Sequence, residues 1–592
     1  MKQTHWWRSV LWLAAMLASS QALAAGDPDF EVWSEHTTEY TAADDLLTAG
    51  LGLEGLRSPP PGFEQPHSPS AAELRRLAMH SAWNALALLG PAGGLGDDGV
   101  FRDLAPVAGH EVSALLRLPG AAHPFRVLVQ IPARPATSPA CLLVAPASGS
   151  RGVYGAVPLA GPTALSRGCA IAYTDKGAGT DFHTLDDDRT PTLSGVRVAN
   201  ESDPAPFRVE GEAAPGALAM KHAHSGDHPE ADWGRHVLAA ARFGQQQLRA
   251  RLAPDTELQI LAVGLSNGAA AVLRAAEIDH AGLLNAVVAV MPNITGPGVA
   301  PLYDYATLAA LLQPCALGDG ERTLAKPLGS PLLVALGEQR CASLVDAGVL
   351  DAAAPEAARG LLLDAGFDGP ALRLGAGNVA LDLWRAVAGS YASAYLRRGP
   401  DDMPCGYGLR ATAAEEAQRA AWWASHSGVG PGGGIELIDT LATEAGGDSA
   451  LPGLLCLREL WTGESEESVA LRTAVEQTRA TAQLADIPVL LIHGREDGLI
   501  PAALSSRPYV ASARAGGAQR LAYWEIDRAQ HFDAFLNVPG VADRLVPILP
   551  YGWVGIDHLF EVLAEQAELG PDRRFAPVPG SAALSRERMG LD

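Results

Sequence analysis

The segment LAVGLSNGAAAVLRAAE, residues 261–277, joins a short apolar run to an alanine-rich stretch through a serine flanked by glycines. The apolar run is typical of a buried strand, and the alanine-rich stretch is typical of a helix. Between them, residues 264–268 fit the pattern Gly-x-Ser-x-Gly. In this context the pattern predicts a tight turn that projects the Ser266 hydroxyl from the edge of a sheet, where it can act as a nucleophile. A glycine-rich turn with an incidental serine is the alternative interpretation.

Further apolar runs indicate that this strand belongs to a larger sheet. Short continuous runs begin at residues 140, 169, 258, 285, 487 and 519, and helical patterns such as residues 230–252 separate several of them. Buried parallel strands joined by helices have this pattern. Residues 111–118 and 125–132 flank a Pro-Gly turn and suggest an antiparallel pair. We therefore predict an α/β fold with a mostly parallel central sheet.

The sequence patterns divide the rest of the chain into segments around this core. Residues 26–105 are loop-rich and are expected to form an N-terminal extension. Residues 106–296 and 483–592 are expected to form the two parts of the α/β core. Between them, residues 297–482 lack the regularly spaced strand patterns and have helical and loop patterns instead. We interpret this block as a large helical insertion, which we call the lid.

The first residues predict export from the cytoplasm. Lys2 and Arg8 precede an apolar run that is shorter than a membrane-spanning helix needs, and small residues follow it. We interpret residues 1–25 as a signal peptide of a periplasmic or secreted protein, with a membrane anchor as the alternative. Outside the cytoplasm, the six cysteines could form up to three disulfides, and the sequence leaves their pairing open.

The charge balance limits the possible partners. The formal net charge is −23 at pH 7, which disfavours nucleic acid as a partner. After signal cleavage we expect no membrane association, and the oligomeric state stays open.

A serine nucleophile needs a base, and the base needs a carboxylate to orient it. Asp497 lies in the loop HGREDGLIP, and His531 lies in RAQHFDAF, each directly after a predicted strand. Catalytic groups of open α/β sheets collect at the carboxyl ends of the strands. The chain order Ser266, Asp497, His531 is that of the α/β-hydrolases. The sequence therefore predicts an α/β-hydrolase fold with these three residues as its catalytic set.

Other residues could fill the same roles. His558 is the alternative base, although it has a helical context, and Asp527 and Asp533 are the alternative acids. For the oxyanion of the tetrahedral intermediate, the first donor is expected to be the backbone N–H of Asn267. The second is expected from the loop after the strand at 140, at Ser148 or Gly149, where a plain turn is the alternative.

A histidine-rich segment, residues 221–236, raises the question of a metal site. It contains His222, His224, His228 and His236, whose spacing suits zinc, but Gly226 and Pro229 interrupt any regular face. We predict no metal and no cofactor. The alternatives for these histidines are packing, or binding a substrate carboxylate together with Lys221 and Arg235.

With these residues in view, the chain resembles the D-(−)-3-hydroxybutyrate oligomer hydrolases, bacterial enzymes of polyhydroxybutyrate breakdown. The resemblance rests on residues 44–56, 172–180, 221–234 and 266–277, together with the loops that hold Asp497 and His531. It implies hydrolysis of soluble oligomers to monomers, downstream of the polymer depolymerase, through an acyl-enzyme on Ser266. The chain departs from the family pattern in having Ala269 and Ala270 where more glycine is expected.

The substrate and two rival functions complete these expectations. Each oligomer ends in a carboxylate, so a local cation should bind it, and the candidates are Arg151, Lys176, Lys221 and Arg235. Secreted tannases and feruloyl esterases are the nearest rival class, but they carry cysteines beside the catalytic serine and histidine. This chain has Asn267 and Phe532 there. The other rival is a non-catalytic binding protein on a hydrolase scaffold.

Overall fold

The computed structural model describes residues 30–592 apart from 97–100, 136–138, 200–204, 319–330, 426, 429–432, 443–447 and 539. A ten-stranded sheet forms its centre, with the strand order β1-β2-β3-β5-β4-β10-β11-β14-β15-β16. The strands are β1 (Glu31–Tyr40), β2 (Gly109–Arg117), β3 (Phe125–Pro132), β4 (Ala140–Pro146), β5 (Ala170–Thr174), β10 (Leu258–Leu265), β11 (Ala286–Val290), β14 (Val489–Gly494), β15 (Leu521–Ile526) and β16 (Arg573–Phe575).

The direction of the strands follows the sequence patterns. Strands β5, β4, β10, β11, β14, β15 and β16 pair in parallel. The pair β2–β3 is antiparallel, as are its neighbours β1–β2 and β3–β5. Because β5 lies between β3 and β4, the strand order reverses there before it continues through β10. This mostly parallel sheet confirms the predicted α/β fold.

Helices cover both faces of the sheet, which explains why its central strands are continuously apolar. The helices α3 (Val157–Ala164) and α17 (Leu549–Leu563) share one apolar cluster, to which Leu143 of β4 belongs. The helices α5 (Pro229–Arg249), α6 (Asn267–Ile278) and α16 (Ser506–Ala515) share the other, with Leu142 and Val144. Successive side chains of a strand point to opposite faces, so each face needs its own apolar residues.

The N-terminal extension contains more regular structure than predicted. β1 adds an edge strand antiparallel to β2, and the helices α1 (Gly52–Arg57) and α2 (Ala71–Leu86) follow it. Ser70 and Glu73 form a capping box at the start of α2. Most side chains of β1 are exposed, and its sequence EVWSEHTTEY is correspondingly polar, so it lacks the apolar pattern of the buried strands.

The described part of residues 175–228, between β5 and α5, forms a small excursion from the core. It contains β6 (Phe182–Thr184) paired with β9 (Leu218–Met220), β7 (Thr190–Pro191) paired with β8 (Arg197–Val198), and the short helix α4 (Lys221–His224).

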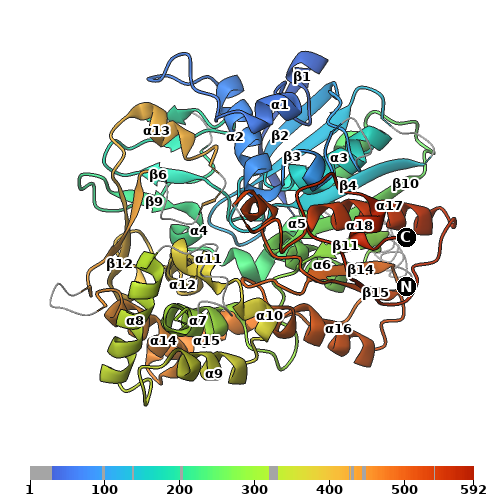
Figure 1. Ribbon diagram of the computed structural model, residues 1–592. Coiled ribbons are helices and arrows are strands. Elements are labelled where there is room, and N and C mark those ends of the chain that lie inside the picture. Colours follow the sequence, from blue (N-terminus) through green and yellow to red (C-terminus); the bar gives the residue numbers. More distant parts are fainter. Residues whose placement is uncertain are drawn as a thin grey trace, which may run out of the picture.

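The lid is predominantly helical, in line with its sequence pattern. Figure 1 shows most of its helices gathered at the lower left, beside the sheet. They are α7 (Leu302–Ala316), α8 (Pro331–Asp346), α9 (Pro355–Asp364), α10 (Gly369–Leu372), α11 (Gly375–Ala380), α12 (Leu383–Tyr395), α13 (Glu416–Ala421), α14 (Leu451–Thr462) and α15 (Glu466–Gln477). The lid also contains an antiparallel pair, β12 (Tyr407–Ala411) and β13 (Ile435–Asp439), which the sequence patterns do not predict. The short helix α18 (Arg586–Met589) is the last helix in the sequence.

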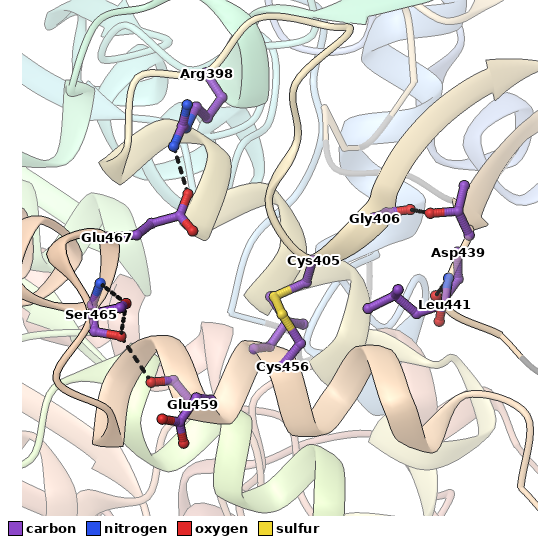
Figure 2. The surroundings of a disulfide bond; sticks show 12 residues. Arg398, Cys405, Gly406, Asp439, Leu441, Cys456, Glu459, Ser465 and Glu467 are labelled. Atoms are coloured by element: carbon purple, nitrogen blue, oxygen red, sulfur yellow. Dashed lines mark hydrogen bonds and ion pairs between the residues drawn. A yellow bond between two sulfur atoms is a disulfide. The ribbon is translucent and has the colours of Figure 1, made fainter.

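All six cysteines are paired. Cys141–Cys169 lies in the core, whereas Cys315–Cys341 and Cys405–Cys456 lie in the lid. Figure 2 shows Cys405–Cys456 joining the turn before β12 to α14, close to the ion pair between Arg398 and Glu467. Disulfides of this kind contribute typically about 2–4 kcal/mol each by limiting the unfolded chain. Two of the three therefore stabilise the lid, where the large sheet does not reach.

The predicted signal peptide, residues 1–25, lies outside the described residues. Among the residues that the structure does describe, we find no helix with the length and hydrophobicity required to cross a membrane.

Candidate active site

Ser266 lies at the sharp turn between β10 and α6, with backbone angles φ 59° and ψ −122°. Such a conformation is costly for a residue other than glycine and persists only when its surroundings impose it. A Cβ atom on Gly264 would lie 2.3 Å from the Gly268 carbonyl oxygen, and one on Gly268 would lie 2.4 Å from that of Pro146. Both glycines are therefore needed for close packing of strand, helix and the loop after β4. The predicted strand–turn–helix context of Ser266 is present.

Three polar side chains from separate strand ends meet at this turn. His531 Nε2 is 2.9 Å from Ser266 Oγ, and His531 Nδ1 is 2.7 Å from Asp497 Oδ2. Asp497 follows β14 and His531 follows β15, so both lie at the same edge of the sheet as Ser266. All three residues are buried. The structure thus brings together the three residues that the sequence predicts as a set.

The carboxylate of Asp497 is held by more than the histidine. Its Oδ1 accepts hydrogen bonds from the backbone N–H groups of Leu499 and Ile500, at 3.0 and 2.8 Å. Its Oδ2 is also 3.4 Å from Nε2 of His493, a residue that the sequence analysis missed. Burial alone raises the pKa of Asp497, but His531 and His493 outweigh it and lower the pKa to about 2. Asp497 is therefore ionised near neutral pH and can stabilise an imidazolium.

The alternative base and acids have other partners. His558 lies in α17, where its Nε2 is 3.1 Å from the Leu569 carbonyl oxygen and its ring stacks on Trp524. Asp527 forms ion pairs with Arg495 and Arg574.

Asp533 accepts hydrogen bonds from the N–H groups of Ile548 and Leu549 at the start of α17. Burial raises its pKa to about 7, in spite of those two donors. The carboxylate of Asp533 thus caps the start of α17, which indicates a structural role.

The predicted oxyanion positions lie at the start of α6 and in the loop after β4. Asn267 is the first residue of α6, so its backbone N–H has no acceptor within the helix. The loop of residues 147–151, which we call the β4 loop, packs on Gly268 through its first residue, Ala147. The N–H groups of Ala147 and Arg151 donate to Thr174 and Ser148. The candidates for the second oxyanion donor are therefore the backbone N–H groups between them, those of the predicted Ser148 and Gly149 and that of Ser150.

The four candidate cations occupy different environments. Lys221 is buried, and its Nζ donates to the Pro124 carbonyl oxygen and lies 3.5 Å from both Asp175 and Asp181. Arg235 is partly exposed on α5 and pairs with Asp232. Each of these cations thus has a carboxylate partner within the protein.

The other two cations lie at the β4 loop. The Lys176 ammonium donates to the Gly149 carbonyl oxygen and lies over the ring of Trp233. Burial lowers its pKa to about 8. Arg151 is buried as well, and desolvation lowers its pKa to about 10.

The histidine-rich segment has hydrogen-bond and packing partners within the protein. His224 Nδ1 accepts the N–H of Met220, and His228 Nε2 is 2.9 Å from the Ala474 carbonyl oxygen. The ring of His236 packs edge-on against Phe125. Burial lowers the pKa of His224 to about 3 and that of His236 to about 4. In the described part of the chain, no three His, Cys, Asp or Glu residues are grouped to hold a metal ion.

A cavity of about 120 Å³ lies beside His531. It is bounded by the lid helix α11, by the loop after β14 and by the segment after His531. Its lining consists of Leu374, Gly377, Asn378, Ala380, Leu381, Gly498, Leu499, Gln530, His531, Phe532, Phe535, Val538, Val541 and Leu545. The predominantly aliphatic and aromatic character of this lining suits a small apolar group next to the reacting atoms.

Comparison with known proteins yields one family. The family model described as 3HB-oligomer hydrolase matches residues 18–586. Proteins named D-(−)-3-hydroxybutyrate oligomer hydrolase from Burkholderia mallei and Burkholderia pseudomallei are each 36% identical over 631 residues, which cover 93% of this chain and 89% of theirs.

Solved structures of two esterases are more distant. Feruloyl esterase B from Aspergillus oryzae is 12% identical with a TM-score of 0.35, over 86% of this chain and 82% of its own. The rice cell wall degrading esterase LipA from Xanthomonas oryzae is 11% identical with a TM-score of 0.38, over 78% and 91%.

Proposed function

Because the chain belongs to the 3HB-oligomer hydrolase family and is a carboxylic ester hydrolase, we propose that it cleaves soluble D-(−)-3-hydroxybutyrate oligomers to the monomer. The observation that carries the proposal is the hydrogen-bonded chain from Ser266 through His531 to Asp497 at the elbow. Such a chain lets a serine hydroxyl act as a nucleophile on an ester. In the breakdown of the polymer, the reaction follows the depolymerase, which supplies the oligomers.

The mechanism starts with attack of Ser266 Oγ on the ester carbonyl carbon, while His531 Nε2 takes the serine proton. Asp497 stabilises the imidazolium that forms. The N–H of Asn267 and an N–H of the β4 loop donate to the oxyanion of the tetrahedral intermediate. His531 then protonates the departing hydroxyl oxygen as the carbon–oxygen bond breaks. Water, activated by His531, attacks the acyl-enzyme, releases the acid and restores Ser266.

The cavity beside His531 supports a substrate with small apolar substituents. A 3-hydroxybutyrate unit carries one methyl branch, which suits a lining of aliphatic and aromatic side chains within about 120 Å³. The candidates for the carboxylate end of an oligomer stay Arg151, Lys176, Lys221 and Arg235, of which Arg151 belongs to the β4 loop and Lys176 donates to it. A concave pocket of this kind suits a flexible soluble chain better than the flat surface of a solid granule.

The direct test is product release from pure protein given 3-hydroxybutyrate dimer, trimer, solid polymer and methyl ferulate. We expect monomer from the dimer and trimer, at rates far above those on the solid polymer and the ferulate. The Ser266→Ala variant serves as the control for contaminating esterases. Faster cleavage of the ferulate, or equal rates on granules and trimer, would contradict the proposed substrate class.

We also propose that the protein acts outside the cytoplasm. The signal-like residues 1–25 and the three disulfides support this location. Mass spectrometry of the native protein should give a mature start near Ala25 or Gly26 and no free thiol. A full-length cytoplasmic form with six free thiols would contradict it.

A further inference from the structure

A second chain of serine, histidine and carboxylate lies beside the first. Ser150 Oγ is 2.6 Å from His222 Nδ1, and His222 Nε2 is 2.5 Å from Glu230 Oε1. All three residues are buried. Ser150 belongs to the β4 loop, His222 to α4 and Glu230 to the first turn of α5. The chain therefore ties the β4 loop to two helices of the histidine-rich segment, which the proposed mechanism does not use.

Packing connects this second chain to the elbow. The ring of Tyr391, from lid helix α12, meets His222 edge-on at 4.8 Å between centroids. The same tyrosine hydroxyl accepts a hydrogen bond of 2.8 Å from Nδ2 of Asn267, the residue after Ser266. Asn293 Nδ2 in turn donates to Asn267 Oδ1 at 2.8 Å. One tyrosine thus contacts both the helix that orients the β4 loop and the residue that supplies the first oxyanion donor.

The hydrogen-bond directions in the second chain follow from the carboxylate. Burial raises the pKa of Glu230, but His222 and His228 outweigh it and lower the pKa well below the usual range. The ionised carboxylate can only accept, so His222 Nε2 carries a proton that it donates to Glu230. In the neutral imidazole, Nδ1 then accepts the Ser150 hydroxyl proton. Glu230 thereby fixes the orientation of both the histidine ring and the serine.

The conformation of the β4 loop depends on contacts that hold it. The loop contains Gly149 in the left-handed region, at φ 55°, and three further contacts hold it in place. Lys176 donates to the Gly149 carbonyl oxygen, Gly428 donates to the Ser150 carbonyl oxygen, and Ala147 donates to Thr174. Donors to an oxyanion must be placed to within about 0.5 Å to act fully. The side chain of Ser150 reaches a buried partner, His222, which Glu230 orients.

We propose that Ser150, His222 and Glu230 are positioning residues that hold the β4 loop so that its backbone N–H completes the oxyanion hole with Asn267. The inference rests on the proposed ester hydrolysis at Ser266. The three residues act through the loop and do not touch the substrate. Their loss therefore affects the transition state, in which the oxyanion exists, much more than the bound ester.

The test compares Ser150→Ala and His222→Gln with His183→Gln. His183 is a suitable control because it is also buried and has a carboxylate partner, Asp188 at 2.9 Å, but belongs to β6 and contacts neither the β4 loop nor the elbow through these bonds. We expect kcat of the first two variants to fall about 10²-fold with KM nearly unchanged. Displacing a group at the reacting centre by about 1 Å lowers the rate by about this factor. The control should stay within about twofold of the parent.

A transition-state analogue separates positioning from general damage. A trifluoromethyl ketone forms an oxyanion on Ser266, so its inhibition constant should rise in proportion to the loss of kcat/KM in Ser150→Ala and His222→Gln. Titration of Ser266 with a fluorophosphonate, taken to completion, counts folded enzyme and corrects for any unfolded fraction. Unchanged kcat and unchanged inhibitor affinity would overturn the inference, as would covalent labelling of Ser150 in Ser266→Ala. Failure of the parent protein to cleave any oligomer would instead refute the proposed function.

Discussion

The two chains of serine, histidine and carboxylate differ in backbone and in access, although their side chains are alike. Ser266 lies on a strained elbow, and its histidine lines the cavity of about 120 Å³. Ser150 lies in a loop, and its histidine is covered by Tyr391. His531 contacts its serine through Nε2, whereas His222 contacts its serine through Nδ1. A hydrogen-bonded triple becomes a nucleophilic site only where the backbone presents the hydroxyl to a space that a substrate can enter.

The sharpest test of this comparison removes each serine in turn. Ser266→Ala, and equally His531→Ala, should lower turnover of 3-hydroxybutyrate dimer by about 10⁶-fold, because nucleophile and base act as a unit. Ser150→Ala should cost about 10²-fold, since the loop keeps its other contacts. Turnover numbers corrected for folded protein decide the outcome. Equal losses in the two serine variants would mean that the distinction between the chains is wrong.

The second test compares the two carboxylates. Asp497→Asn should lower kcat about 10⁴-fold, because the amide favours the wrong tautomer of His531. Since the pKa of Asp497 is about 2, the parent carboxylate is ionised throughout the range from pH 5 to 9. Ionisation of Asp497 therefore does not contribute to the pH dependence of the parent rate over that range, which a pH–rate profile of the parent checks.

Glu230→Gln is the matched variant, with an expected loss of about 10²-fold. If Asp497→Asn lowered kcat no more than Glu230→Gln does, Asp497 would not belong to the catalytic set. Asp533 would then be the next candidate for the catalytic acid.

The sequence predicted the first chain and missed the second for a physical reason. The elbow is local, because Gly264 and Gly268 are required within five residues, and Asp497 and His531 follow apolar strands directly. Ser150 and His222 are 72 residues apart and meet only through the packing of α4 on the β4 loop. His493, which supports Asp497, lies only four residues before it in β14, and their contact depends on how the loop after the strand turns back.

The sequence could not show the environment of the candidate cation Lys221. A lysine in a polar segment is expected to be exposed. Lys221 instead lies between Asp175 and Asp181, which are 46 and 40 positions away in the chain. Desolvating a charge is costly unless it is paired, so a fully buried lysine is expected to have acquired partners from distant segments. Edge strand β1 was missed for the opposite reason, because exposure gives it a polar sequence.

A third test concerns access, the other difference between the two chains. A Cβ atom at Gly377 in α11 would lie 3.7 Å from the ring of Phe535, so Gly377→Ala narrows the cavity without a clash. We expect kcat/KM for a 3-hydroxyvalerate dimer to fall about 10-fold more than that for the 3-hydroxybutyrate dimer, since one methylene in a pocket has about this effect. Gly360→Ala in α9 is the matched control, because a Cβ there meets nothing within 4 Å. Equal effects on the two dimers would show that this cavity does not hold the branch of the substrate.

The smallest expected effect is that of chelation, which tests whether the histidine-rich segment is a hydrogen-bonded network or a metal site. A metal ligand must offer a free lone pair, but both ring nitrogens of His222 are engaged by Ser150 and Glu230. His228 Nε2 faces the Ala474 carbonyl oxygen, which leaves that nitrogen to carry the proton of a hydrogen bond. Exhaustive chelation should therefore change neither the rate on 3-hydroxybutyrate dimer nor the affinity for the trifluoromethyl ketone, and elemental analysis should find no stoichiometric zinc. A loss of rate that zinc restores would make the second chain part of a metal centre. Ser266, His531 and Asp497 would then be the catalytic residues, whereas His222 and Glu230 would be metal ligands.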